Sequence, residues 1–178
     1  MGDLPGFLGR GLVVEPGVCA IFLEEGRAAV GQVGPGHYTL DTLLDRVPGM
    51  RGIRRVTAIM AEAGEVSLPF HLADLPFADG RRVAAHAELC FRLADGLASF
   101  VNFMQGRERV LRDELRDHLL PEVEDAAREW VASRRSADLS GSLVQKDALA
   151  AAVGEHLRET LEALGLQFER VRALAFQV

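Results

Sequence analysis

The chain has 178 residues, of which 48 % are hydrophobic and 26 % are charged, and its formal net charge at pH 7 is −6. This length and composition are ordinary for a globular protein with its own core. The acidic balance argues against a nucleic-acid partner, and against purely electrostatic binding to an anionic membrane, because both need a basic surface.

The first eleven residues predict a flexible N-terminal segment, rich in glycine and interrupted by Pro5. The segment lacks the cationic start and continuous apolar stretch of a signal peptide. No apolar run in the chain approaches the roughly 20 residues of a membrane-spanning helix. We therefore expect a cytoplasmic protein. Leu4, Phe7 and Leu8 are the candidate contact with a membrane surface or a partner, and the alternative is a frayed end that partly packs on the domain.

The first half of the chain predicts short strands separated by turns. Glycine, in two cases next to proline, stands at the boundaries between apolar runs, and both residue types favour turns. The predicted strands are Val13–Val14, Val18–Leu23, Arg27–Val33 and Tyr38–Leu40.

A longer hairpin follows. Residues 65–72 alternate between apolar and other side chains, which predicts a strand with one buried face. Pro69 cannot donate to a strand ladder, so this strand is expected at a sheet edge. Asp79-Gly80 is a strong hairpin turn signal, and residues 83–93 then form the clearest alternating strand of the chain.

The apolar period then changes to that of helices. A helix is predicted over residues 107–133, with a kink at Pro121 or a second helix that begins there. Its apolar stripe is Leu111, Leu115, Leu119, Val123, Ala126 and Trp130. A further helix is predicted from Ser142, which has capping-box spacing to Gln145, to the C-terminal glycine Gly165. A closing strand over 166–178 completes an α+β pattern.

Several of these segments resemble the SPFH (band-7, stomatin, prohibitin and flotillin-like) family in their order and spacing. The segments that carry the resemblance are Val13-Val14-Glu15-Pro16-Gly17, Val33–Leu40, Ala78-Asp79-Gly80 with the strand ending Phe91-Arg92-Leu93, and Lys146–Leu166 with Val171. The resemblance covers roughly residues 12–178. It implies one SPFH-like domain over residues 1–178, with a β-rich lobe over about 12–75 and an α/β lobe over about 76–178 that holds two main helices and the closing strand.

The resemblance also implies large homo-oligomers, often at membranes. The chain departs from the family pattern in two ways, since it shows neither a membrane-inserting segment before the domain nor a long coiled coil after it. It is therefore expected to be either an unusual soluble member or a fragment of a longer chain.

Glycines and metal-ligating residue types are candidates for phosphate or metal binding. Gly31, Gly34 and Gly36 do not form a phosphate-binding or dinucleotide fingerprint, so turns are the favoured interpretation. His86 and Cys90 lie four residues apart on a predicted strand, about 13 Å along its axis, which is too far for two ligands of one metal. Two buried thiols, Cys19 and Cys90, and a sheet-surface histidine are therefore expected, with no tightly bound metal.

Charged residues of the first predicted helix are the remaining catalytic candidates. Glu114 with His118, and Asp113 with Asp117, share helix faces among arginines. Paired carboxylates act as acid and base only where burial or crowding separates their pKa values, so a solvated charged face is favoured. Trp130 is likewise expected in the core rather than in a ligand site.

These observations predict a non-enzymatic assembly or scaffold domain that forms homo-oligomers, with peripheral membrane contact as an option. The alternative is a monomeric protein-interaction module that recruits or regulates a partner such as a protease or an ATPase. Neither function calls for a cofactor or for nucleic acid.

Overall fold

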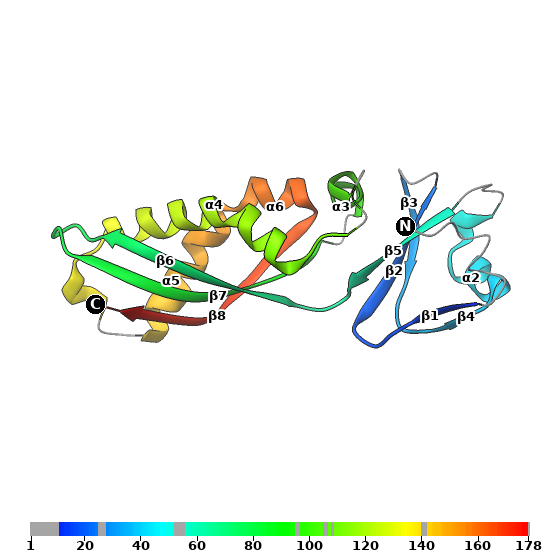
Figure 1. Cartoon of the computed structure of the whole chain (residues 1–178), viewed down its shortest axis with the longest axis horizontal. Helices are drawn as coiled ribbons and strands as arrows, with labels where there is room; N and C mark the ends of the chain where they lie inside the picture. The colour runs from blue at the N-terminus through cyan, green and yellow to red at the C-terminus, as the bar shows by residue number, and fades with distance from the viewer. Residues whose placement is uncertain are drawn as a thin grey trace. The chain divides into compact units, whose positions relative to one another are not determined.

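A computed structural model of the chain describes residues 11–24, 28–51, 56–94, 97–104, 107, 109–139 and 142–177. It is a mixed α+β structure that divides into two compact units, one made of Met1–Gly64 and Leu93–Arg109 and the other of Glu65–Arg92 and Val110–Val178 (Figure 1). The lobes predicted from the sequence divided near residue 75 instead. The division comes earlier because residues 66–76 pair with residues 82–93 in one sheet.

The first unit is built around β2, which pairs antiparallel with both β3 and β5. A two-stranded antiparallel pair of β1 with β4 accompanies this sheet. The elements are β1 (Leu12–Val14), β2 (Val18–Glu24), β3 (Ala28–Val33), β4 (Gly36–Tyr38), α2 (Leu40–Arg46), η1 (Pro48–Met50), β5 (Val56–Glu62) and α3 (Leu97–Met104).

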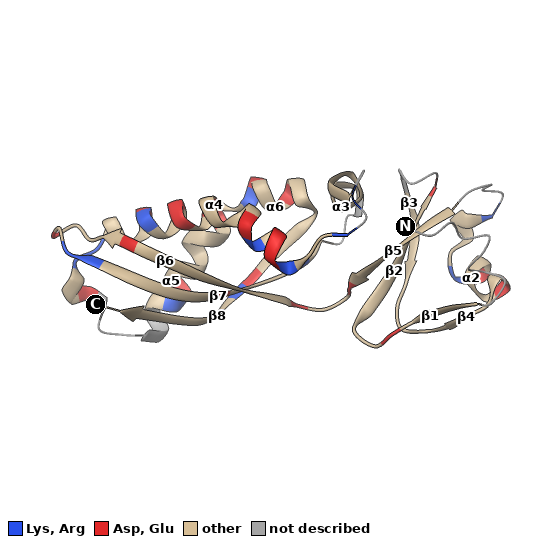
Figure 2. Ribbon diagram, in the orientation of Figure 1, with Lys and Arg blue, Asp and Glu red and all other residues tan. Residues whose placement is uncertain are grey.

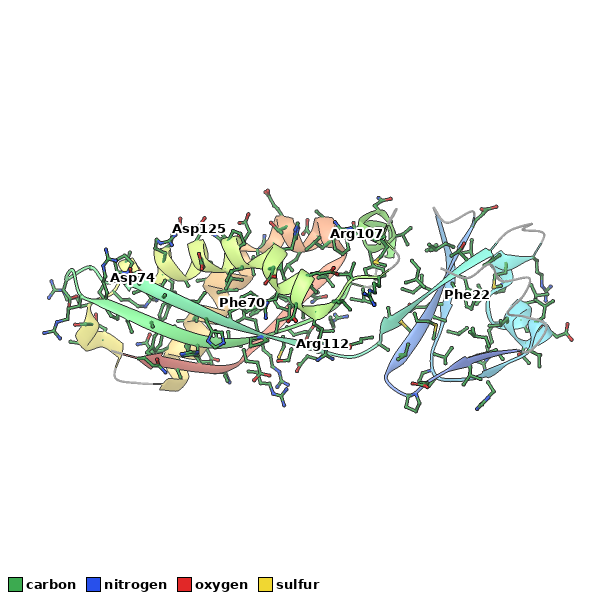
Figure 3. All side chains as sticks on the ribbon, in the orientation of Figure 1. Phe22, Phe70, Asp74, Arg107, Arg112 and Asp125 are labelled. Atoms are coloured by element: carbon green, nitrogen blue, oxygen red, sulfur yellow. The ribbon has the colours of Figure 1, made fainter. Side chains whose placement is uncertain are left out.

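Both faces of β2 are buried, which explains its continuous apolar run. Phe22, labelled in Figure 3, belongs to a cluster with Leu43 of α2 and Val47. Ile21 points the other way and belongs to a second cluster with Val101 of α3. The first unit therefore has a hydrophobic cluster on each side of its central strand.

The predicted strand Tyr38–Leu40 is wrong in its second half. β4 ends at Tyr38, and Thr39 is the N-cap of α2. The Thr42 amide donates to Thr39 Oγ1 at 3.3 Å, and the Thr39 amide donates to Thr42 Oγ1 at 2.8 Å. Two threonines thus form the reciprocal contacts of a capping box, a role usually filled by glutamate or glutamine at the second position. The sequence reasoning also missed β5 and α3.

The second unit is a three-stranded sheet in the order β6-β7-β8, packed against helices. Its elements are β6 (Val66–Pro76), β7 (Arg82–Leu93), α4 (Arg112–Ala132), η2 (Ser136–Leu139), α5 (Ser142–His156), α6 (Arg158–Leu164) and β8 (Leu166–Gln177). α4 packs on β6 and on α5, whereas α5 and α6 pack on β8 (Figure 1). The predicted edge position of the Pro69 strand is confirmed.

The buried face of this sheet carries the alternating apolar side chains predicted for its strands. Phe70, labelled in Figure 3, is 1 % exposed. Phe91 of β7 meets Phe168 of β8 edge to face, with ring centroids 5.9 Å apart. Trp130 of α4 stacks on Phe176 of β8 at 6.2 Å, which confirms that this tryptophan is a core residue.

The helices differ from the prediction at their ends. α4 begins at Arg112, so Leu111 precedes it and is 48 % exposed. Pro121 lies inside α4 without ending it, on the exposed side. The predicted helix from Ser142 is split at Leu157 into α5 and α6. Gly165 does close α6 in the left-handed conformation, with φ of 68°, as expected of a C-terminal glycine.

No helix in the described part of the chain has the length and apolar character needed to cross a membrane.

Candidate functional site

The register of the β6–β7 hairpin decides which side chains meet on its polar face. The Phe77 amide donates to the Arg81 carbonyl at 2.8 Å, so the loop has three residues, Ala78 to Gly80. Gly80, with φ of 81°, takes the left-handed position that such loops require. One extra residue of β6 is then absorbed near Asp74, where φ is 60° and the register shifts. Both features together set the pairing of the remaining strand.

That register places three cross-strand pairs on the face of the sheet opposite the helices. The pairs are Ser67 with Cys90, Pro69 with Glu88, and His71 with His86. Their neighbours along each strand point into the core, because successive side chains of a strand alternate between faces. This face, defined by the six residues above, is called the polar sheet face.

The two histidines are the closest titratable pair on the polar sheet face. His71 Nδ1 and His86 Nδ1 lie 2.5 Å apart, and the rings meet edge to face with centroids 4.5 Å apart. Since the two nitrogens form a hydrogen bond, one ring donates its hydrogen and the other accepts it through a lone pair. Two imidazole nitrogens therefore converge on one point at a surface that solvent reaches.

A separate group of polar contacts lies along the same face. Ser67 Oγ donates to Glu88 Oε1 at 2.5 Å, and Arg172 of β8 approaches the same carboxylate oxygen at 3.5 Å. The Cys90 thiol contacts Ser67 Oγ at 3.7 Å. Burial, and then the neighbouring Glu65, raise the pKa of the Cys90 thiol, so it stays protonated and is a poor nucleophile.

Ion pairs to β8 tie the third strand to this face. Arg170 makes two hydrogen bonds to the Glu65 carboxylate, at 2.9 and 3.0 Å. This guanidinium lowers the pKa of Glu65. Arg92 pairs with Glu169 and donates to Gln167 at 2.8 Å. The charged groups of the face are thus largely neutralised within the unit.

The two edge strands of this sheet, β6 and β8, differ in how well they are protected against pairing with a strand of another chain. β6 carries Pro69 and the irregularity at Asp74, whose carboxylate pairs with Arg82 at 2.9 Å. β8 is twelve residues long and contains no proline. Lys146 Nζ of α5 donates to the Arg172 carbonyl of β8 at 2.7 Å.

The carboxylates weighed as acid and base groups lie on an exposed helix surface, where Figure 2 shows acidic and basic residues side by side along α4. Glu114 accepts from the Leu111 amide at 2.8 Å and so closes the start of α4. Asp113 and Asp117 both bind Arg116, at 3.0 and 2.8 Å. With side chains 81 % and 65 % exposed, the two aspartates confirm the predicted solvated face.

The glycines serve packing as well as turns. Gly34 and Gly36 flank the turn before β4, and the Tyr38 hydroxyl donates to the Gly34 carbonyl at 3.0 Å. Gly31 instead lies inside β3, where a Cβ atom would come within 2.5 Å of Val47. Because Gly31 has no side chain, Val47 can pack closely against β3. Gly31 therefore serves packing, whereas the sequence predicted a turn.

The structure does not bring His86 and Cys90 together, because each contacts a different residue of β6. Both cysteines are buried and unbridged, as expected. The histidine pair was missed, since neither residue's partner can be found without the hairpin register. Leu4, Phe7 and Leu8, the predicted membrane or partner contact, lie outside the described residues.

No protein-family model matches the chain, and a search of curated proteins finds no match either.

Proposed function

We propose that the chain is a non-enzymatic assembly domain of the SPFH type, which associates with further copies of itself through the outer edge of β8. The difference between the two edges of the second sheet carries this proposal. The order of turns and strands that resembles the SPFH family supports it, because that resemblance implies homo-oligomers.

Natural proteins protect exposed sheet edges against pairing with other chains. β6 has two such devices. Pro69 lacks the amide hydrogen that a neighbouring strand would bind, and the bulge at Asp74 bends the edge away from a straight partner. Strand addition at β6 is therefore disfavoured.

β8 offers the opposite combination. It is twelve residues long, and no proline interrupts it. Ala173 and Ala175 are exposed, so they present little steric obstruction to a strand laid alongside. The charged side chains of β8, Glu169, Arg170 and Arg172, are engaged in ion pairs within the unit. Lys146 donates to the Arg172 carbonyl, and its flexible side chain can move aside when a partner strand arrives.

A second copy suits this edge because two identical strands can pair around a two-fold axis, each donating to and accepting from the other. Each backbone hydrogen bond contributes about 0.5–1.5 kcal/mol net. Association itself costs an estimated 4–15 kcal/mol. The edge alone therefore supports weak pairing, and the net charge of −6 opposes it further unless salt screens the repulsion.

Sedimentation velocity of the protein at low and high salt tests the proposal, across roughly 5–500 μM because oligomerisation follows mass action. We expect the sedimentation coefficient to rise with concentration and with salt. Ala175→Lys at the β8 edge should abolish the rise. Ala73→Lys, the same change at an exposed alanine of the guarded β6 strand, should leave it intact.

Two results would refute this proposal. A monomer under every condition favours the alternative, a monomeric module that recruits or regulates a partner such as a protease or an ATPase. Self-association that Ala175→Lys does not reduce places the interface elsewhere on the chain.

We also propose that Leu4, Phe7 and Leu8 make any contact of such assemblies with a membrane surface. Insertion of apolar side chains into the membrane interface does not require an attraction between opposite charges, so the acidic protein can still bind in this way. Flotation with neutral phosphatidylcholine vesicles tests this contact. Phe7→Asp should release the protein from the vesicles, and equal flotation of both forms would refute the assignment.

A further inference from the structure

One pair of side chains on the polar sheet face takes no part in the proposed assembly through β8. His71 and His86 sit directly opposite each other on neighbouring strands, with Nδ1 atoms 2.5 Å apart. We propose that this pair is a binding site for a divalent transition-metal cation of the zinc class, held between the two Nδ1 atoms.

The distance between the nitrogens is close to what such an ion requires. Zinc binds histidine nitrogen at about 2.0–2.1 Å with tetrahedral angles, so two ligating nitrogens lie about 3.3 Å apart. Starting from 2.5 Å, the two rings need to separate by about 0.8 Å to admit the ion. Small changes in side-chain torsion supply this movement, because the β6–β7 backbone already holds the two residues opposite each other.

The proton balance is also simple. In the present pair one Nδ1 carries the hydrogen and the other accepts it. When the ion takes the place of that hydrogen, the donating ring changes tautomer and carries its hydrogen on Nε2. Both rings then bind as neutral imidazoles, which is the form that ligates metals, and no net proton is lost.

The chemistry of the donors selects the class of ion. Imidazole suits zinc, copper and nickel, whereas magnesium and calcium prefer oxygen ligands. In the described part of the chain no group of three or more His, Cys, Asp and Glu side chains is placed to hold a metal ion. The site therefore has two protein ligands, and the remaining positions of a bound ion are open to water or to a ligand from outside.

The neighbouring carboxylate does not compete for this role. Glu88 accepts from Ser67 Oγ at 2.5 Å and lies 3.5 Å from the Arg172 guanidinium. It is farther than His86 from the loop that joins β6 to β7. Its charge is thus compensated within the network. Metal binding at the histidines leaves those hydrogen bonds intact.

Calorimetric titration of the purified full chain with zinc chloride, in a buffer that does not chelate metals, tests the inference. We expect one zinc ion per chain and no heat from magnesium chloride under the same conditions. Because two linked ligands bind more tightly than either alone, His71→Asn or His86→Asn should weaken zinc binding by roughly a hundredfold. Asparagine keeps a hydrogen-bonding group at the position but is a poor zinc ligand.

His37→Asn is the matched control. His37 is an exposed strand histidine whose cross-strand partner is Val13, so no second imidazole faces it. Its loss should leave zinc affinity unchanged. The fluorescence of Trp130, the one tryptophan of the chain, shows whether each variant keeps the second unit folded.

Zinc affinity of the unsubstituted protein that equals that of a folded His71→Asn variant would overturn the inference, as would affinity that falls equally in His37→Asn. In either case the histidine contact is a hydrogen bond with a structural role only. The result is independent of the sedimentation test, because that test places its substitutions on β8 and on Ala73.

Discussion

Replacement of Leu157 by alanine should be among the most damaging single changes in the second unit. Leu157 is fully buried where α5 gives way to α6, and both helices pack on β8. Its amide donates to Val153 and its carbonyl accepts from Leu161, both at 2.9 Å, so the backbone runs on almost as a helix. The substitution therefore acts through the lost side chain rather than through the backbone.

The magnitude follows from the atoms removed. Leucine to alanine deletes three buried carbon atoms, worth about 0.8 kcal/mol each in transfer from water. The cavity left behind adds to this loss, so the free energy of unfolding should fall by about 2–5 kcal/mol. At a slope of about 2 kcal/mol per M urea, a loss of 3 kcal/mol lowers the urea midpoint by about 1.5 M.

Urea unfolding followed by Trp130 fluorescence measures this change, since Trp130 and Leu157 belong to the same unit. Leu111→Ala is the matched control because the Leu111 side chain is 48 % exposed. Its loss should cost only about 0.5 kcal/mol. Equal midpoints for the two variants would refute the reasoning, because burial could not then be what makes Leu157 important.

Two further predictions concern the hairpin tip and the first unit. Hydrogen bonds from Ser136 lower the pKa of Asp79, so its carboxylate stabilises the fold above the ordinary aspartate pKa, and this contribution is lost as pH falls through the lowered value. The urea midpoint of Asp79→Asn should therefore lie below that of the parent protein at pH 7, with a smaller gap at acid pH; a gap that widens on acidification contradicts this. Gly49→Ala should lower the stability of the first unit by about 1–3 kcal/mol, because a Cβ atom there comes within 2.8 Å of the Val30 carbonyl oxygen. Hydrogen exchange of β3 amides measures it against Gly64→Ala, where the added atom meets nothing within 4 Å, and equal protection in the two variants would speak against the clash.

Local pattern was enough to predict the elements whose residues depend mainly on their immediate neighbours. β7 alternates between buried and partly buried residues from Val83 to Leu89 and was predicted almost to the residue. Gly165 closes α6 because the backbone there takes the left-handed conformation, which glycine adopts without steric cost. α2 was missed because its capping box has Thr42 in place of the usual glutamate or glutamine. The break at Leu157 was missed because Leu157 continues the apolar stripe of both helices.

The sequence by itself determined that the chain is α+β, that β6 lies at an edge, and that both cysteines and Trp130 are buried. Only the tertiary structure decided which side chains of the hairpin meet. A two-residue turn at Asp79-Gly80 would set His71 opposite Glu88, whereas the three-residue loop and the bulge near Asp74 set it opposite His86. The bulge exists because Leu72 and Leu75 are three residues apart, and a regular strand would send them to opposite faces. Both are buried, 2 % and 1 % exposed, so packing against the helices determines the register and with it the histidine pair.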